Sequence, residues 1–207
     1  MYIPKAFHVA DHQVLWEFIE ANSFATLISV LDGKPFATHL PLLFDRTRAA
    51  HGALLGHVAR ANPQWRAFDG KGEALAIFQG PHAYVSPSWY ATAPAVPTWN
   101  YTAVHVYGAP RVIDDDKAFS ELLDRLIAVY EAERPTPWPG ILPADFRAHL
   151  MQGIVGFAMD IERIEGKFKL SQNRSREDQR RVVEHLETST DPAARALSEL
   201  SRQHLGL

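Results

Sequence analysis

The stretch from Phe78 to Gly108 reads FQGPHAYVSPSWYATAPAVPTWNYTAVHVYG and is dense in Trp, Tyr, His and Pro. Two segments typical of strands flank a loop of small residues. Within a short span of it lie Trp89, Tyr90, Trp99 and Tyr101, each of which combines an apolar ring with a polar atom. Such rings either fill a core or line a pocket for a planar ligand, and the stretch taken alone favours the core.

The composition is that of a globular protein. Of the 207 residues, 46% are hydrophobic and 22% are charged, and no run of about 18 apolar residues predicts a membrane span. The first residues do not resemble an export signal, so we expect a cytoplasmic protein. The absence of cysteine excludes disulfides and thiolate metal sites. A net charge of −3 gives DNA binding only weak support.

Hydrophobic periodicity predicts mostly antiparallel strands with helices between them. Strands are expected at 24–31, 35–44, 51–58, 74–79, from the second half of the opening stretch to Ile113, and at 154–164. Helices are expected at 11–21, 63–69, 115–133, 144–152, 176–187 and 192–204. Asp32-Gly33 predicts a hairpin, Asn62-Pro63 a helix start, and Pro41 an edge position. The pattern indicates an α+β barrel or sandwich.

The usual motifs of nucleotide and metal chemistry are missing. Gly70-Lys71-Gly72 lacks the third glycine and the following helix of a dinucleotide site. Among ten histidines, His57, His82 and His105 lie on or beside separate strands and could converge. A metal ion needs three or more converging ligands, so surface or core positions are favoured and no metal is expected.

The last two helices are joined by Thr188–Asp191, a spacing that a helix-turn-helix shares. Arginines of the first helix alternate with acids, which is typical of a solvated helix face. We therefore expect a helical hairpin without a role in DNA binding.

Donors for an anionic group gather at two places. Residues 56–62 place His57, Arg60 and Asn62 beside a helix start, and residues 166–174 contain Lys167, Gln172 and further donors. Ordinary loop polarity would also explain each cluster. Together with the aromatic stretch, they indicate a phosphorylated planar ligand.

Five motifs then resemble one family in the same order and spacing. They are THLP from Thr38, GHVARANP from Gly56, FQGPHAYVSPSWY from Phe78, VPTWNYTAVHVYG from Val96 and EGKFKLSQNR from Glu165. The chain resembles the PaiB family, bacterial proteins labelled FMN-binding negative transcriptional regulators, from Met1 to about His185.

The resemblance implies a mostly antiparallel split β-barrel of the pyridoxamine-phosphate-oxidase-like superfamily, with peripheral helices and a C-terminal helical hairpin. It implies a homodimer with FMN at each end of the dimer interface. The implied contacts are Thr38, His39 and Leu40 along the isoalloxazine ring; His57, Arg60 and Asn62 at the phosphate and ribityl chain; Trp99 and Tyr101 near the flavin; and Lys167 and Gln172 closing the site. The superfamily's usual Arg-Lys pair is absent, because Ala59–Asn62 holds one base.

We expect residues 1–187 to form the FMN-binding barrel and 188–207 a helical extension. The first hypothesis is an FMN-binding regulator that represses transcription. The alternative is an FMN-dependent oxidoreductase acting on a small molecule, with His57, His82 and His105 as candidate acids or bases. The third is a haem-binding or flavin-free module of the same fold. The sequence does not decide whether the protein is an enzyme.

Overall fold

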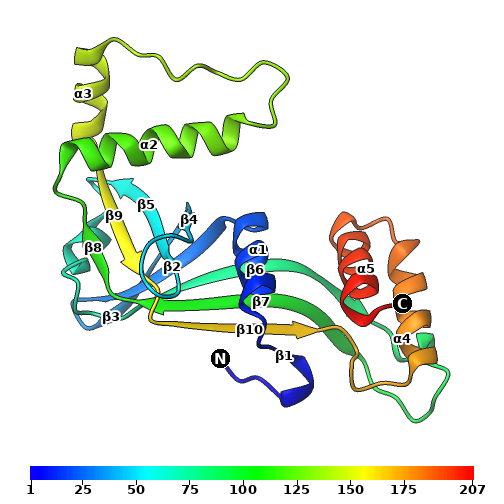
Figure 1. Ribbon diagram of the computed structural model, residues 1–207. Coiled ribbons are helices and arrows are strands. Elements are labelled where there is room, and N and C mark those ends of the chain that lie inside the picture. The colour runs from blue at the N-terminus through cyan, green and yellow to red at the C-terminus, as the bar shows by residue number, and fades with distance from the viewer. The chain divides into compact units, whose positions relative to one another are not determined.

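The computed structural model describes residues 1–207, and its strands form two sheets (Figure 1). The larger sheet has the strand order β1-β10-β7-β6-β2-β3, and the smaller has β4-β5-β9-β8. The strands are β1 His8–Val9, β2 Phe24–Leu31, β3 Lys34–Pro41, β4 Leu43–Asp45, β5 Ala53–Ala59, β6 Ala74–Val85, β7 Thr98–Gly108, β8 Pro110–Val112, β9 Ile154–Asp160 and β10 Arg163–Lys169. The strand pairs with a described register are antiparallel.

Five α-helices and three short 3₁₀ helices connect the strands. The α-helices are α1 His12–Ala21, α2 Asp116–Glu131, α3 Ala144–Gln152, α4 Arg176–Glu187 and α5 Pro192–Leu205. The 3₁₀ helices are η1 Lys5–Phe7, η2 Pro63–Ala67 and η3 Pro87–Trp89. The predicted α+β class and the C-terminal helical hairpin are confirmed.

The chain divides into two compact units. The first comprises 1–22, 78–105 and 165–207, and the second comprises 23–77 and 106–164. The smaller sheet, α2, α3 and the β2–β3 hairpin belong to the second unit, whereas α1, α4 and α5 belong to the first.

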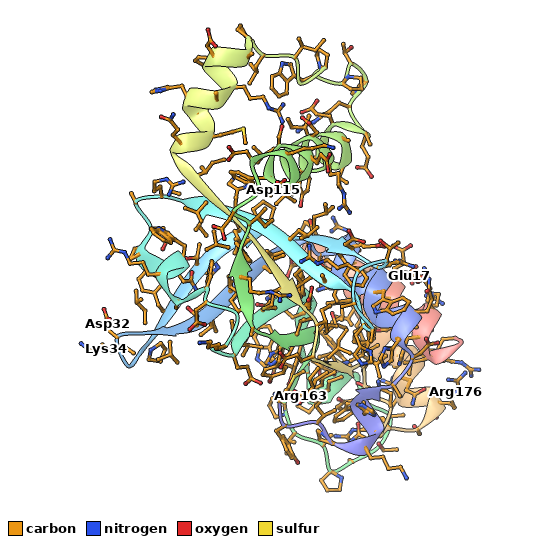
Figure 2. The ribbon with its side chains drawn as sticks, turned by 60° about the vertical axis from the view of Figure 1, so that its left-hand side comes forward. Glu17, Asp32, Lys34, Asp115, Arg163 and Arg176 are labelled. Atoms are coloured by element: carbon orange, nitrogen blue, oxygen red, sulfur yellow. The ribbon has the colours of Figure 1, made fainter.

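In the second unit, the β2–β3 hairpin turns at the predicted Asp32-Gly33. Both residues have positive φ, 51° and 74°, which suits the tight turn that Figure 2 shows between Asp32 and Lys34. Pro41 ends β3, the edge strand of its sheet, as predicted. The hairpin therefore places Thr38–Leu40 on an edge strand.

Helix α2 covers the smaller sheet. Asp115 caps its first turn by accepting a hydrogen bond from the Ala118 backbone N–H (Figure 2). A cluster of buried apolar side chains joins the helix to β5 and β9: Leu55, Phe119, Leu122, Leu126 and Ala158. Gly156 allows this approach, because a Cβ at that position would overlap the Phe119 ring.

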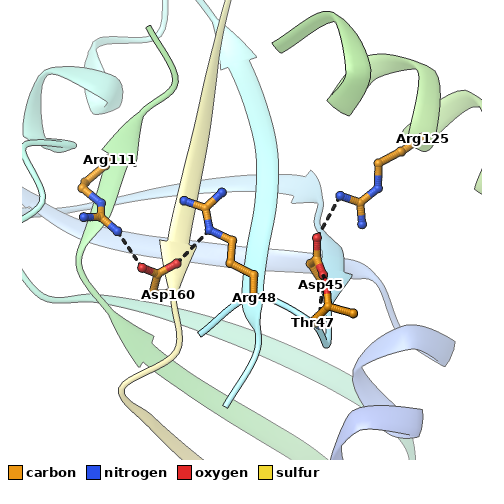
Figure 3. A network of polar contacts seen from close by, with 6 residues as sticks. All are labelled: Asp45, Thr47, Arg48, Arg111, Arg125 and Asp160. Atoms are coloured by element: carbon orange, nitrogen blue, oxygen red, sulfur yellow. Dashed lines mark hydrogen bonds and ion pairs between the residues drawn. The ribbon is translucent and has the colours of Figure 1, made fainter. Parts of the chain in front are cut away.

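Ion pairs join the strands of the smaller sheet to the neighbouring loop and to α2 (Figure 3). The Asp160 carboxylate accepts from Arg48 Nε at 3.0 Å and Arg111 Nη2 at 2.6 Å. Asp45 accepts from Arg125 Nη1 of α2 at 2.9 Å. Burial alone would raise the pKa of Asp45, but hydrogen bonds from Thr47 and Arg125 outweigh it and lower that pKa.

In the first unit, α1 buries Leu15, Phe18 and Ile19, and the Phe18 ring lies 5.1 Å from that of Phe168. Ser175 caps the start of α4 by accepting a hydrogen bond from Asp178 N. The buried carboxylate of Asp178 on α4 accepts from Ala91 N at 2.7 Å and from Thr92 Oγ1 at 2.6 Å. The loop after η3 is thereby tied to α4.

Three strands that the sequence predicts as continuous are broken, so the predicted 35–44, the strand to Ile113 and 154–164 are wrong in this respect. The breaks fall at Leu42, at Ala109 and at 161–162. At each break the chain passes from one sheet to the other, from β3 to β4, from β7 to β8 and from β9 to β10. Local sequence pattern does not encode such a change of sheet.

The predicted strand character of the first aromatic segment also ends early. β6 stops at Val85, and Ser86 caps the 3₁₀ helix η3 by accepting a hydrogen bond from Ser88 N at 3.3 Å. Ser86-Pro87 is a turn signal that could have revealed this end.

Candidate functional site

Asn62 connects the edge strand β3 with η2 in the second unit. Its Oδ1 accepts a hydrogen bond from Gln64 N at 3.0 Å and so caps η2 as predicted. Its Nδ2 donates to Thr38 Oγ1 at 2.8 Å. The structure therefore brings together Thr38 and Asn62, which the resemblance assigned to the ring and to the phosphate end of one ligand.

Gln64 reinforces this connection, and the sequence reasoning missed it. The side chain is fully buried. Its Nε2 donates towards Leu27 O at 3.1 Å, Ser29 Oγ at 3.1 Å and Phe36 O at 3.2 Å. Its Oε1 has no hydrogen-bond partner. No local signal marks it, because its partners lie 28 to 37 residues away in sequence.

The other predicted residues of β3 point to opposite faces. Leu40 is buried, whereas His39 is exposed and its Nδ1 lies 2.9 Å from Thr26 Oγ1. Alternate residues of a strand face opposite sides of the sheet, so Thr38 and Leu40 share one face and His39 lies on the other.

Arg60 directs its guanidinium to backbone carbonyls. Nε donates to Gln152 O at 2.6 Å, and Nη2 donates to Ile154 O at 3.0 Å. Arg60 and Trp65 also line a cavity of about 620 Å³ together with Phe119, Arg147 and Met151. Two donor groups of Arg60 are thus engaged within the chain, which leaves Nη1 for a ligand.

His57 lies on β5 directly opposite Gly156 of β9. Burial lowers the pKa of its imidazole, so the neutral form predominates at pH 7. Its buried Nδ1 has no hydrogen-bond partner. A neutral imidazole can donate or accept one such bond, and this atom therefore has unused capacity.

In the first unit, Trp99 forms an open aromatic group with two residues of β6. The Trp99 ring centroid lies 6.1 Å from that of Tyr84 and 6.2 Å from that of His82. Trp99 is 54% exposed and Tyr84 is 44% exposed, so their rings are not core. The stretch taken alone favoured a core, and the exposed Trp99 does not fit that expectation.

Lys167 lies between two tyrosines of the same unit. Its Nζ is 5.1 Å from the Tyr101 ring centroid and 5.4 Å from that of Tyr2, and it donates to Tyr2 O at 3.1 Å. The side chain is buried. The structure therefore brings together Tyr101 and Lys167, two of the predicted residues.

The remaining donors after β10 are engaged within the chain. Gln172 accepts from Leu170 N at 2.7 Å and donates to Phe168 O at 2.5 Å. Ser171, at φ 71°, accepts from Asn100 Nδ2 at 2.9 Å, and Arg174 lies over the Tyr90 ring. These contacts stabilise the turn, and Gln172 has less capacity for a ligand than its sequence position indicates.

The structure was also searched for metal ligands and for helices that could cross a membrane. No group of three or more His, Asp or Glu side chains is placed to hold a metal ion. None of the helices has the length and apolar character that crossing a membrane requires.

Comparisons with known proteins agree with the fold and the motifs. Residues 1–163 match a family model described as "Putative FMN-binding domain". The protease synthase and sporulation protein PAI 2 of Bacillus subtilis (strain 168) is 42% identical over 207 residues, covering 99% of this chain and 98% of its own.

Two solved structures share the fold at low sequence identity. The flavocytochrome Anf3 from Azotobacter vinelandii has a TM-score of 0.65 at 16% identity and covers 86% of this chain and 77% of its own. The FAD and heme binding protein from Mycobacterium smegmatis has a TM-score of 0.62 at 20% identity, covering 83% of this chain and 78% of its own. The predicted split-barrel fold is confirmed.

Proposed function

Since this chain belongs to the PaiB family of FMN-binding domain proteins, we propose that it binds FMN as a split-barrel homodimer and represses transcription. The relative in Bacillus subtilis is named for protease synthesis and sporulation. A regulatory role for this chain is carried over from that name and from the family resemblance.

The observation that best supports FMN binding is the Thr38–Asn62 contact on the edge strand. The outer edge of β3 lacks a neighbouring strand, so its backbone groups other than Phe36 O, which Gln64 engages, are available to the hydrogen-bonding edge of a flavin ring. The buried, unpaired Nδ1 of His57 offers a further hydrogen bond. These groups fit a ligand that has both an apolar ring and polar edges.

We assign the flavin contacts as the resemblance implies. Thr38, His39 and Leu40 accompany the ring, while His57, Arg60 and Asn62 meet the ribityl chain and phosphate. Trp99, Tyr101, Lys167 and Gln172 complete the set. Bound FMN would supply a redox-active ring, and the side chains of this protein would orient it and exclude water.

The proposed homodimer is supported by one uncovered face of the β2–β3 hairpin. Phe24 and Val30 are 69% and 62% exposed on this face. Thr26 pairs with His39 and Ile28 with Ala37 across the same face. An exposed apolar sheet face of this kind suits burial against a second copy of the chain.

Direct DNA binding has little support from charge. Arginines of the C-terminal hairpin are engaged internally: Arg176 donates to Leu205 O at 2.6 Å, Arg195 to Ser189 O at 2.7 Å and Arg202 to Glu187 at 2.8 Å. The repressor proposal is tested by the mobility of the protein's own promoter fragment at several salt concentrations. If the promoter fragment is not shifted at any of these salt concentrations, repression by direct DNA binding is contradicted.

FMN binding is tested by quenching of FMN fluorescence during titration with the purified protein. We expect saturable quenching and a rise in melting temperature, because a ligand that binds only the folded state stabilises it. Arg60→Ala and His57→Leu should weaken FMN binding. Lys117→Ala on α2, whose lysine is 86% exposed, is the matched control. No quenching by the wild-type protein would contradict the proposal.

A second candidate function, an FMN-dependent oxidoreductase, is favoured by the exposed Trp99 and Tyr84. Exposed aromatic rings can contact a second small molecule, which a protein that only binds FMN would not need. Bleaching of the FMN-loaded protein by NADH or NADPH under anaerobic conditions tests this candidate. Reoxidation by an added acceptor would support it, and a flavin that neither reagent reduces would contradict it.

A further inference from the structure

Two arginines share one carboxylate on the smaller sheet. Asp160 accepts from Arg48 Nε with one carboxylate oxygen and from Arg111 Nη2 with the other (Figure 3). The arginine side chains are 43% and 54% exposed, so a molecule from solution can reach them. Because Arg48 contacts Asp160 through Nε, its two terminal nitrogens make no hydrogen bond within the chain. They form a fork of donors that fits a second carboxylate.

A cavity of about 410 Å³ lies beside these arginines, and every residue that lines it belongs to the second unit. Part of its wall is apolar, because Leu55, Leu122 and Ala158 of the cluster under α2 line it. Asp45 and Arg125 also line it, but they are joined by a hydrogen bond of 2.9 Å and balance each other. The volume is that of a site for a small molecule.

Carboxylates line the same cavity where α2 begins. Asp115 caps the helix, and Glu121 lies 3.8 Å from the Lys117 ammonium group. The exposed carboxylate of Asp114 makes no hydrogen bond within the chain. Asp114 follows Arg111 by three residues, which span at most about 10 Å even when extended. One small molecule can therefore meet both a guanidinium and a carboxylate in this cavity.

We propose that this cavity binds a free α-amino acid with an aliphatic side chain. The ligand's carboxylate contacts Arg48 and Arg111, its ammonium group contacts Asp114, and its side chain covers the apolar part of the wall. A simple anion or a simple cation would satisfy only one of the two charges. No residue assigned to FMN lines the cavity, so the proposal goes beyond FMN binding and does not depend on it.

The test uses leucine as the probe and three analogues that each lack one feature. N-acetylleucine lacks the ammonium group, leucinamide lacks the carboxylate, and glycine lacks the side chain. Each is titrated into the full-length protein without FMN, and binding is followed by calorimetry and by the rise in melting temperature. We expect leucine to bind and each analogue to bind about tenfold more weakly or worse, because each loses a charge-assisted contact or an apolar burial.

Variants assign the two ends of the ligand. Arg48→Gln should weaken leucine binding about tenfold or more and leave the affinity for leucinamide unchanged, because leucinamide has no carboxylate to lose. Asp114→Asn should likewise weaken leucine binding and leave the affinity for N-acetylleucine unchanged. Arg134→Gln and Asp145→Asn, at exposed positions of the same unit, are the matched controls and should bind leucine as the wild type does. Both replaced side chains are solvent-accessible, and thermal melts check that each variant is folded.

Three results would overturn the inference. One is a wild-type protein that leucine neither stabilises nor binds in the calorimeter. Another is equal affinity for leucine and N-acetylleucine, which would reduce the cavity to a carboxylate site. The third is unchanged affinity for leucine in folded Arg48→Gln or Asp114→Asn. Failure of the protein to quench FMN fluorescence would contradict the proposed function alone, since the leucine titrations contain no flavin.

Discussion

Asn62 serves two elements through one side chain, accepting from the backbone of η2 and donating to Thr38 of β3. Asn62→Ala removes both bonds, and loss of a helix cap alone costs about 1 kcal/mol. We expect the free energy of unfolding to fall by about 1–2 kcal/mol and FMN affinity to fall as well. Urea unfolding and FMN fluorescence titration measure the two effects.

Thr38→Val separates these contributions. It removes the hydroxyl that Asn62 contacts and leaves the cap of η2 intact, so its cost in stability should be smaller than that of Asn62→Ala. Equal losses of stability in the two variants would show that the cap contributes nothing. Unchanged FMN affinity in both folded variants would remove this contact from the proposed site.

Among single residues, the sequence predicted those whose role depends on neighbours close by in the sequence. The cap at Asn62 follows from the adjacent Pro63 and is confirmed. Gln64 was missed because its partners lie 28 to 37 residues away in sequence. Asn100 was missed for the same reason, since it donates to Ser171, 71 residues further along. Burial of a polar side chain becomes visible only with the fold.

At the scale of elements, Gly108 marks the point where β7 leaves the larger sheet and the chain enters β8. A Cβ at this position would overlap the backbone oxygen of Asp160, which cannot move as a side chain can. We therefore expect Gly108→Ala to lower the free energy of unfolding by about 3 kcal/mol. Urea unfolding measures the change.

Gly72→Ala is the control for this prediction. A Cβ at Gly72 would meet no atom closer than 4.0 Å, so the variant should lie within about 0.5 kcal/mol of the wild type. Equal stability of the two variants would show that β7 and β9 tolerate separation at Gly108.

The exposed face of the β2–β3 hairpin leads to a second prediction about an element. Val30 is 62% exposed, so Val30→Lys should cost little in a monomer but should place a charge in the proposed dimer interface. We expect light scattering after size-exclusion chromatography to show a dimer for the wild type and a monomer for this variant. Ile141→Lys, at an 81% exposed position of the second unit, should remain dimeric. A dimer for Val30→Lys would exclude this face from the interface.

The elements themselves were largely predictable, and their assembly was not. The helix start at Asn62-Pro63 and the turn at Asp32-Gly33 are local signals, and each is confirmed. Segments that look continuous in the sequence are divided between the two sheets. Local pattern does not show this, because pairing partners such as β5 and β9 lie about a hundred residues apart. The resemblance, not the periodicity, predicted the split barrel.

For the whole molecule, partial desolvation of three histidines makes stability dependent on pH. Burial lowers the pKa of His57, His105 and His204 in the folded protein. The unfolded chain has ordinary histidines with pKa values of about 6.5, so below that pH it binds more protons than the folded chain. The contribution of these histidines to the free energy of unfolding is therefore fully present above about pH 6.5. It is lost as the pH falls from there through their lowered pKa values in the folded protein.

Urea unfolding at pH 7.5 and 5.5 should accordingly give a clearly smaller free energy of unfolding at pH 5.5. His204, whose ring lies 5.4 Å from that of Phe168, can be replaced without touching a predicted flavin residue. His204→Phe should reduce the difference between the two pH values, whereas His149→Gln, at an exposed position of α3, should leave it unchanged. Equal pH dependence in the wild type and His204→Phe would mean that protonation of His204 does not change the free energy of unfolding. The loss of stability towards acid would then have to come from the half-buried His57 and His105. Because His57 belongs to the proposed flavin site, added FMN should oppose its protonation.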